Sequence, residues 1–418
     1  MKILSNMSLR LKEMSKKTLA IILAAALVLT VVLPVTVTAL LKNEQVKNGD
    51  EAEQMTESSL SENDKFTKET SEEITQNVDS AEVLKSSCLD KINNQDYNGA
   101  LADINSAIEL SKSDASLYLL QGAANTYLNE YDKAIESYKT AFGLNPEYTQ
   151  VHQAMAYLYY QIGQKDTALA EYTTALTYDF DNTELLQMRM SIYAEQKNYT
   201  NALVDARHLS SLKPEDANTY ACVGDYQFNL QKFSDSAESY TKSLKYALIE
   251  NNNTLINAVT LQRAMCYYNI QDYSSAITDY TSYFSLSTTA STDWIYLAQS
   301  YYNISDMANA KIWFEKCLDA NIQAVVCKYN LAAIYSTEEN HTTAVEYYTA
   351  CIDANYLKDY SLYNRGVSYL SLKEYQKARA DFLSASETTT NEKLKAQATS
   401  SYNKTPNITI ITGSPSSN

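Results

Sequence analysis

One stretch of 34 residues decides the fold: residues 291–324 read STDWIYLAQSYYNISDMANAKIWFEKCLDANIQA. Its small residue Ala310 has a counterpart in eight other stretches, and successive counterparts are 34 residues apart except for one step of 40. These nine marker residues are Ala100, Ala134, Ala168, Ala202, Ser236, Ala276, Ala310, Ala344 and Ala378. Such a period is typical of helix-turn-helix units that stack on copies of themselves. The chain is therefore predicted to contain nine helical hairpins.

Two further positions repeat with the marker. Four residues after it stands a large residue in most units, namely Ile104, Tyr138, Tyr172, Tyr240, Tyr280, Phe314, Tyr348 and Phe382. Twelve residues before it lies a mostly small position, filled by Cys88, Gly122, Ala156, Met190, Gly224, Ala264, Ala298, Ala332 and Gly366. Small residues at two points of a hairpin let its helices approach closely, and the large residues fill the space beside the crossing.

The pattern resembles the tetratricopeptide repeat family, whose tryptophan, leucine, small, tyrosine, alanine and aromatic positions are matched in order by Trp294, Leu297, Ala298, Tyr301, Ala310 and Phe314. The resemblance implies an all-α, right-handed superhelical solenoid. The predicted units are residues 81–114, 115–148, 149–182, 183–216, 217–250, 257–290, 291–324, 325–358 and 359–392. The longer step places an insertion at residues 251–256, and residues 393–402 are expected to form a capping helix.

The N-terminal region differs from the repeats. Residues 1–17 carry five cations against one acid, and residues 18–41 contain no charge. A segment of this length can span a bilayer, and the preceding cations favour a cytoplasmic N-terminus with the repeats outside the cytoplasm. A signal peptide cleaved near Ala39 is the alternative, which would make the protein secreted. Residues 42–80 are acidic and poor in large apolar groups, so we predict a disordered tether, and residues 403–418 are predicted to be a disordered tail.

Composition and charge exclude some functions. Only 8 glycines and 5 prolines occur in 418 residues, which favours continuous helices over a β-rich fold. The formal net charge of −16 repels phosphate backbones, so we expect no nucleic-acid partner.

No pattern for catalysis or metal binding was found. The six cysteines are Cys88, Cys222, Cys266, Cys317, Cys327 and Cys351, and none lies in a Cys-x-x-Cys motif. We expect them to be buried thiols, because equivalent positions in neighbouring units, such as those of Cys317 and Cys351, are too far apart for a disulfide. The three histidines lie in different units without ligand spacing. The sequence predicts a non-enzymatic protein without a cofactor or metal.

Function is therefore assigned to the concave wall, which the family resemblance implies is lined by the first helix of each unit. The candidate ligand groove comprises Gln153, Tyr157, Tyr160, Phe228, Tyr268, Asn269, Gln299, Tyr302, Asn303, Tyr329, Asn330, Tyr363 and Asn364. Aromatic anchors with amide hydrogen bonds suit a peptide or protein segment, which predicts an interaction scaffold. Aromatic rings with amides also suit a sugar, so a carbohydrate-binding or cell-wall-binding surface protein is the alternative.

Overall fold

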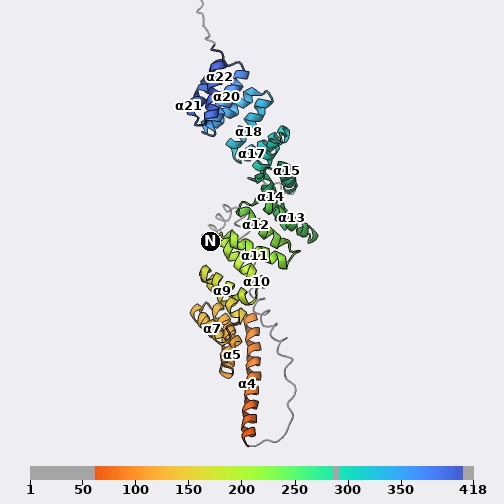
Figure 1. Ribbon diagram of the computed structural model, residues 1–418, viewed down its shortest axis with the longest axis vertical. Coiled ribbons are helices and arrows are strands. Elements are labelled where there is room, and N and C mark those ends of the chain that lie inside the picture. The colour runs from red at the N-terminus through yellow and green to blue at the C-terminus, as the bar shows by residue number, and fades with distance from the viewer. Residues whose placement is uncertain (1–61, 286–290, 408–418) are drawn as a thin grey trace, which may run out of the picture. The chain divides into compact units, whose positions relative to one another are not determined.

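The computed structural model describes residues 62–285 and 291–407, and every element in this part of the chain is an α-helix (Figure 1). The chain divides into two compact units, residues 1–195 and residues 196–418. The helices of the first unit are α4 (Glu62–Asn93), α5 (Tyr97–Leu110), α6 (Ala115–Tyr127), α7 (Tyr131–Leu144), α8 (Thr149–Gln161), α9 (Lys165–Tyr178) and α10 (Thr183–Glu195). Even-numbered helices are the first helices of the predicted hairpins and odd-numbered helices are the second helices.

The second unit continues the same alternation from α11 onward. Its helices are α11 (Tyr199–Leu212), α12 (Ala217–Asn229), α13 (Phe233–Ile249), α14 (Asn253–Asn269), α15 (Tyr273–Ser285), α16 (Trp294–Asn303), α17 (Met307–Asp319), α18 (Ala324–Thr337), α19 (His341–Asp353), α20 (Lys358–Ser371), α21 (Tyr375–Thr388) and α22 (Glu392–Lys404). Within each unit, every helix packs against the next one along the chain. The repeated hairpins predicted from the sequence are therefore confirmed, while the handedness of their stacking stays a prediction.

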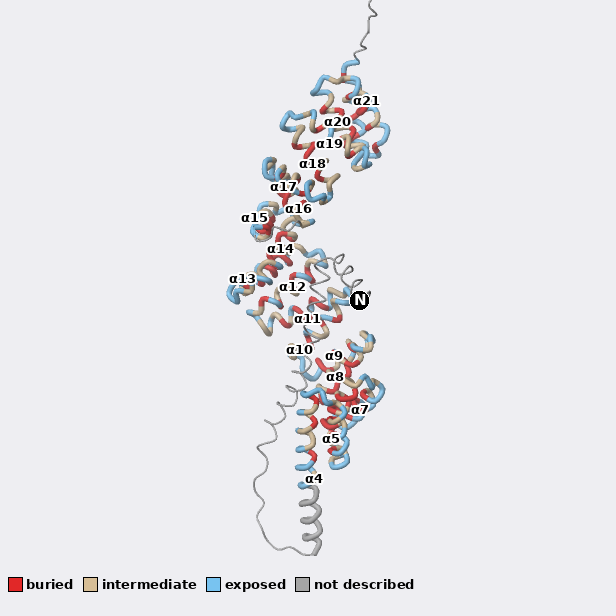
Figure 2. Tube along the Cα trace, turned by 180° about the vertical axis from the view of Figure 1, so that it is seen from behind, coloured by how far each residue is buried: buried red, intermediate tan, exposed pale blue. Residues whose placement is uncertain are grey.

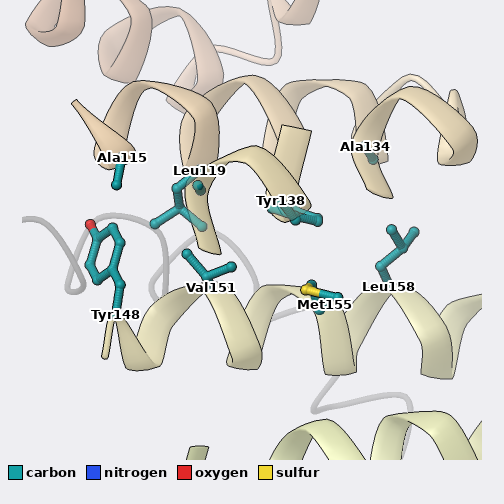
Figure 3. Close-up of a cluster of buried hydrophobic side chains, with 9 residues drawn as sticks. Ala115, Leu119, Ala134, Tyr138, Tyr148, Val151, Met155 and Leu158 are labelled. Carbon is teal, nitrogen blue, oxygen red and sulfur yellow. The ribbon is translucent and has the colours of Figure 1, made fainter. Parts of the chain in front are cut away.

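The periodic positions form the core. All nine marker residues have no exposed surface, and the large residues four positions later are buried at 2% exposure or less where the pattern holds. Figure 2 shows the buried residues on helix faces that are turned toward neighbouring helices. In Figure 3, Leu119 and Tyr138 point toward Val151 and Met155 of α8. Within each unit the core is thus built between neighbouring hairpins, as the stacking of repeats requires.

Close approach explains the small position twelve residues before the marker. A Cβ atom built on Gly122 would lie 2.4 Å from the ring of Tyr138, and one built on Gly366 would lie 2.8 Å from the ring of Phe382. The ring that follows the marker therefore lies directly against the backbone of the first helix. Any side chain at these glycines has to displace that ring.

Every hairpin turns through one residue in the left-handed region, five positions before the marker. These residues have φ between 58° and 80° and are Gln95, Asn129, Gly163, Lys197, Gln231, Gln271, Ser305, Glu339 and Lys373. A left-handed residue after the last helical turn lets its N–H and the next N–H bond to orphan carbonyls. Only one of the nine is a glycine, so eight turns carry the strain that a Cβ adds in this conformation.

The extra residues of the insertion predicted at residues 251–256 are divided between two helices. Helices α13 and α14 have 17 residues each, against 14 in α11 and 13 in α12. The connection between them is short, and the side chain of Asn252 caps α14 by accepting from the Leu255 N–H at 3.1 Å. The extra residues lengthen the end of α13 and the start of α14, because a helix gains one hydrogen bond for each residue it adds.

The predicted disordered tether at residues 42–80 needs correction at its end. Helix α4 begins at Glu62, so residues 62–80 are helical. This segment contains no glycine or proline and carries four glutamates, and its helix continues into the packed part of α4 that starts at the buried residue Ala81. Low hydrophobicity did not predict that a helix would continue outward from its packed end.

The C-terminal cap is observed as α22. Leu394 and Ala398 are buried on its inner face, and Arg379 of α21 donates to the carbonyl oxygens of Tyr402 and Thr405 at 2.8 and 2.9 Å. Helix α22 thus covers the last hydrophobic face, and the guanidinium satisfies carbonyls at its C-terminal end.

Some predictions lie outside the described residues. They are the basic segment 1–17, the membrane anchor or signal peptide at residues 18–41, the tether at residues 42–61 and the tail at residues 408–418. No helix in the described part of the chain has both the length and the apolar character that crossing a membrane requires.

Candidate functional site

The first helices of the second unit bring most of the predicted groove residues together. Helix α14 contacts α16, and α18 contacts α20, although a second helix separates each pair along the chain. We define the first-helix wall as Tyr268, Asn269, Gln299, Tyr302, Asn303, Tyr329, Asn330, Tyr363 and Asn364. Asn269 and Asn303 are exposed, and the other seven are half-buried.

One hydrogen bond joins α14 to α16 across the wall. The Tyr268 hydroxyl donates to Oε1 of Gln299 at 2.6 Å, and the Tyr268 ring lies edge-on to the ring of Tyr296 with centroids 5.0 Å apart. The bond uses the acceptor oxygen of Gln299 and leaves its amide N–H groups able to donate. Tyr268 therefore has both a packing role and a positioning role.

A second pair joins α18 to α20. The amide of Asn364 donates to the Tyr329 hydroxyl at 3.3 Å, and the Tyr329 ring packs edge-on against Tyr348 and Tyr356. Burial and the neighbouring hydroxyl of Tyr302 raise the pKa of Tyr329 to about 12. The hydroxyl of Tyr329 accepts from Asn364 and keeps its own proton available to a ligand.

Three asparagines of the wall use their side-chain N–H groups in hydrogen bonds to their own helices. Asn269, Asn303 and Asn330 each donate to the main-chain carbonyl oxygen four residues earlier, at 2.7, 2.7 and 2.9 Å. Their Oδ1 atoms take no part in these bonds. An amide held by its N–H group presents an oriented acceptor, which is what the N–H groups of an extended peptide require.

The wall carries no charge, although charged residues occur on the same helices. Arg263 of α14 forms two bonds of 2.8 Å with Asp279 of α15, and Arg365 of α20 forms two bonds of 2.8 Å with Asp381 of α21. Both aspartates are buried. These bidentate pairs hold the guanidinium groups against the second helices, so the wall itself consists of hydroxyls, amides and rings.

Three of the predicted groove residues lie in the first unit, on α8. The Tyr160 hydroxyl of α8 donates to Glu195 of α10 at 2.6 Å, and Lys165 pairs with the same carboxylate at 2.8 Å. Burial raises the pKa of Tyr157 to about 12, and the amide of Gln161 donates to its hydroxyl at 2.8 Å. Burial raises the pKa of Glu184 above its usual range, and the neighbouring Gln153 partly offsets this shift. These contacts are ionic as well as aromatic.

Phe228 is half-buried, and its ring makes internal packing contacts. Its ring meets the Phe233 ring edge-on at 5.2 Å, and it packs on the cluster formed by Tyr240, Val259 and Cys266. Tyr363 likewise packs on Phe382, with centroids 5.6 Å apart. The repeat register placed Phe228 and Tyr363 on first helices. It could not distinguish a ring that packs internally from one that a ligand can reach.

The structure also has a hollow that the sequence did not indicate. It has a volume of about 260 Å³ and lies among α11, α12 and α13, lined by residues that include Arg207, Tyr220, Gln227, Ser239 and Lys242. None of the predicted groove residues lines it. Its polar side chains have the pattern of an ordinary solvated helix face, so no sequence signal was available.

Comparison with protein families identifies the repeats. Models described as tetratricopeptide repeat match residues 126–191, 294–321 and 329–391. Small glutamine-rich tetratricopeptide repeat-containing protein 2 of Saccharomyces cerevisiae is 29% identical over 102 residues, which cover 24% of this chain and 30% of that protein. DnaJ homolog subfamily C member 3 of Gallus gallus is 24% identical over 217 residues, covering 48% of this chain and 42% of that protein. The chain thus spans less than half the length of these relatives.

Solved structures resemble parts of this chain with low overall superposition. A tetratricopeptide repeat protein from Parabacteroides merdae has 16% identity and a TM-score of 0.38, with 61% of this chain and 99% of that chain covered. PilF of Pseudomonas aeruginosa has 20% identity and a TM-score of 0.35, with 50% and 92% covered. The nine buried marker residues, the hairpins on either side of them and the three family matches lead to one conclusion: this chain contains tetratricopeptide repeats.

Proposed function

We propose that this protein is a non-enzymatic interaction scaffold that binds an uncharged peptide segment of a partner protein along the first-helix wall. The observation that carries the proposal is the chemistry of that wall, where tyrosine hydroxyls and oriented amide oxygens lie on four first helices without a charged group among them. Such groups satisfy the backbone of an extended peptide, while the half-buried rings receive its side chains.

The same geometry favours a peptide over a glycan. A sugar stacks on the exposed face of a ring, and the wall tyrosines are half-buried, with Tyr268 and Tyr329 each packed against other tyrosines. The available groups are the hydroxyl edges and the amide acceptors. These match main-chain N–H and C=O groups better than a flat sugar surface.

A single-residue comparison tests the wall. A peptide of about twelve uncharged residues is selected on the full chain from a displayed library, and its affinity is measured by fluorescence anisotropy. Asn303→Ala removes an acceptor from the wall and is expected to weaken binding about fivefold, the equivalent of about 1 kcal/mol.

The control is Asn229→Ala. Asn229 makes the same bond to its own helix, donating to the Asp225 carbonyl at 2.7 Å, but it lies on α12 beside an aspartate. Asn229→Ala should lower the free energy of unfolding by the same amount as Asn303→Ala, with less than about a twofold loss of affinity for the peptide. Equal losses in both variants, or no peptide enriched by the full chain, would contradict the proposal.

We further propose that the repeats are displayed outside the cytoplasm, because residues 18–41 are uncharged and follow a basic segment. The full chain is expressed with a protease site engineered after Gly49. Protease added outside spheroplasts should release the repeats if they are retained by an anchor, and a cleaved, secreted form should be recovered from the medium. Recovery of intact chain only from lysed cells would contradict both forms of the proposal.

A further inference from the structure

The contact between α17 and α18 places two thiols together in the core. Cys317 of α17 and Cys327 of α18 have no exposed surface and belong to one hydrophobic cluster, which also contains Phe314 and Leu331. Both cysteines belong to the side chains that α17 and α18 pack against one another, and the Cys327 S–H donates to the Ile322 carbonyl at 3.3 Å. Neither cysteine is in a disulfide.

Cys317 and Cys327 are neighbours because of their positions in the repeat, and not because of one particular side-chain orientation. Cys317 stands seven residues after its marker, and Cys327 stands seventeen residues before the next marker. The residues at these two positions also share a cluster at other interfaces, as Ala107 does with Leu117. Ala141 and Val151 form the same kind of pair between α7 and α8. Cys317 and Cys351 stand at equivalent positions of successive repeats, whereas Cys327 stands at the position that faces Cys317.

We propose that Cys317 and Cys327 form a redox modification site at which a small disulfide compound oxidises the pair to an intrachain disulfide joining the seventh and eighth repeats. One protein thiolate attacks the small disulfide and releases one small thiol. The second protein thiolate then attacks the mixed disulfide and releases the other. The protein loses two hydrogens and two electrons, and the small disulfide takes them up as two thiols.

Within the folded core the two thiols have unequal environments. The neighbouring Cys317 thiol lowers the pKa of the Cys327 thiol, while the Cys327 thiol together with burial raises the pKa of Cys317. A thiolate held by a neighbouring S–H group lies beside the thiol that has to resolve the mixed disulfide. Because both sulfurs are buried, the reaction takes place while the repeats are folding or locally open.

The next interface along the chain supplies a matched control. Cys351 occupies the position of Cys317 one repeat later, and Ser361 occupies the position of Cys327. Ser361 makes the equivalent bond to the preceding loop, donating to the Tyr356 carbonyl at 3.1 Å, and both residues are buried. The two loops have matching left-handed residues, with φ of 54° and 44° at residues 321 and 323 and 54° and 40° at residues 355 and 357. The two interfaces thus differ in their thiols: the first has two cysteines, and the second has one cysteine and one serine.

The test is refolding of the full chain in a glutathione redox buffer. The chain is unfolded in urea with reductant, so that all thiols are accessible, then refolded with oxidised and reduced glutathione. Remaining thiols are alkylated and the peptides are mapped by mass spectrometry. We expect a linked pair of peptides containing Cys317 and Cys327, about 2 Da lighter than the reduced pair, with Cys351 alkylated. A refolded, helical chain in which Cys317 and Cys327 are both alkylated overturns the proposal, as does preferential linkage of either one to another cysteine.

Two variants keep the result independent of folding defects. Cys317→Ala introduces the residue found at this position in several other repeats, as at Ala107 and Ala141, so it should fold and form no disulfide at Cys327. Ser361→Cys should create a second disulfide, with Cys351, under the same conditions. Oxidation should raise the melting temperature of the wild-type chain by about 5 °C and leave that of Cys317→Ala unchanged. No linkage in Ser361→Cys, or the same rise in Cys317→Ala, contradicts the assignment of register and site.

Discussion

The first helices of the two compact units use the same repeat position for different chemistry. In the first unit, Tyr160 of α8 donates to Glu195, which Lys165 also binds. In the second unit, Tyr268 of α14 donates to the neutral amide of Gln299 at the same distance of 2.6 Å. The hairpin crossings behind both are alike, with every marker residue fully buried. One scaffold therefore carries an ionic surface in one unit and a neutral wall in the other.

The largest effects should come from breaking what the two units share. Ala134→Phe and Ala310→Phe place a ring in a hairpin crossing that has no exposed surface, one in each unit. Each should destabilise its unit by about 3 kcal/mol or more in urea unfolding followed by circular dichroism. Ile312→Phe is the control because Ile312 lies on the same helix as Ala310 and is 49% exposed. Similar losses for the control and Ala310→Phe would show that the marker is not the tight point of the crossing.

The next prediction concerns how the second unit keeps its wall neutral. Arg263→Met leaves Asp279 buried without its bidentate partner and should cost about 3 kcal/mol in urea unfolding. The double change Arg263→Met with Asp279→Leu removes both charges and should recover most of that loss. Lys242→Ala breaks an exposed pair with Glu238 and should have no measurable effect. If the double variant were no more stable than the single one, the buried charge would not be the cause.

The hairpin turns should respond to relief of their strain in both units. Asn129→Gly and Lys373→Gly replace residues with φ of 60° and 62° by the residue that tolerates this conformation. The gain expected is about 0.5 to 1 kcal/mol for each, smaller for asparagine than for lysine. Asn145→Gly, at an extended helix cap, should destabilise slightly instead. Thermal unfolding of the three variants checks the order, and a loss of stability in Lys373→Gly would contradict it.

The smallest effect should come from Glu184, on the ionic surface of the first unit. One oxygen of Glu184 is buried without a hydrogen bond, and burial raises the pKa of its carboxyl above the unfolded value. The folded state then binds more protons than the unfolded state, so stability falls as the pH rises from below the unfolded pKa through the folded one. Glu184→Gln should stabilise the chain at pH 7 by about 0.5 kcal/mol, allowing for partial exposure, and give no gain at pH 4. A gain of equal size at both pH values would exclude ionisation as the cause.

The sequence predicted the features that recur and missed those that occur once. Helices α6, α8, α10 and α12 begin at the first residue of their predicted units, and α18 and α20 begin one residue earlier, because the same packing constraint recurs in these copies. The extension of α4 and the longer α13 and α14 have no periodic signal. Cys317 and Cys327 could have been found by pairing the seventh residue after one marker with the seventeenth before the next. Which rings of the wall pack internally depends on side-chain contacts that a register does not contain.

The salt dependence of peptide binding tests the neutral wall most directly. The affinity of the selected uncharged peptide for the full chain is measured from about 50 to 500 mM salt, a range over which contacts between exposed charges are progressively screened. The account predicts a change in Kd of less than about twofold for the wild-type chain. A tenfold or greater loss of affinity over this range would show that charged groups carry the binding and would contradict the assignment of the ligand to the first-helix wall.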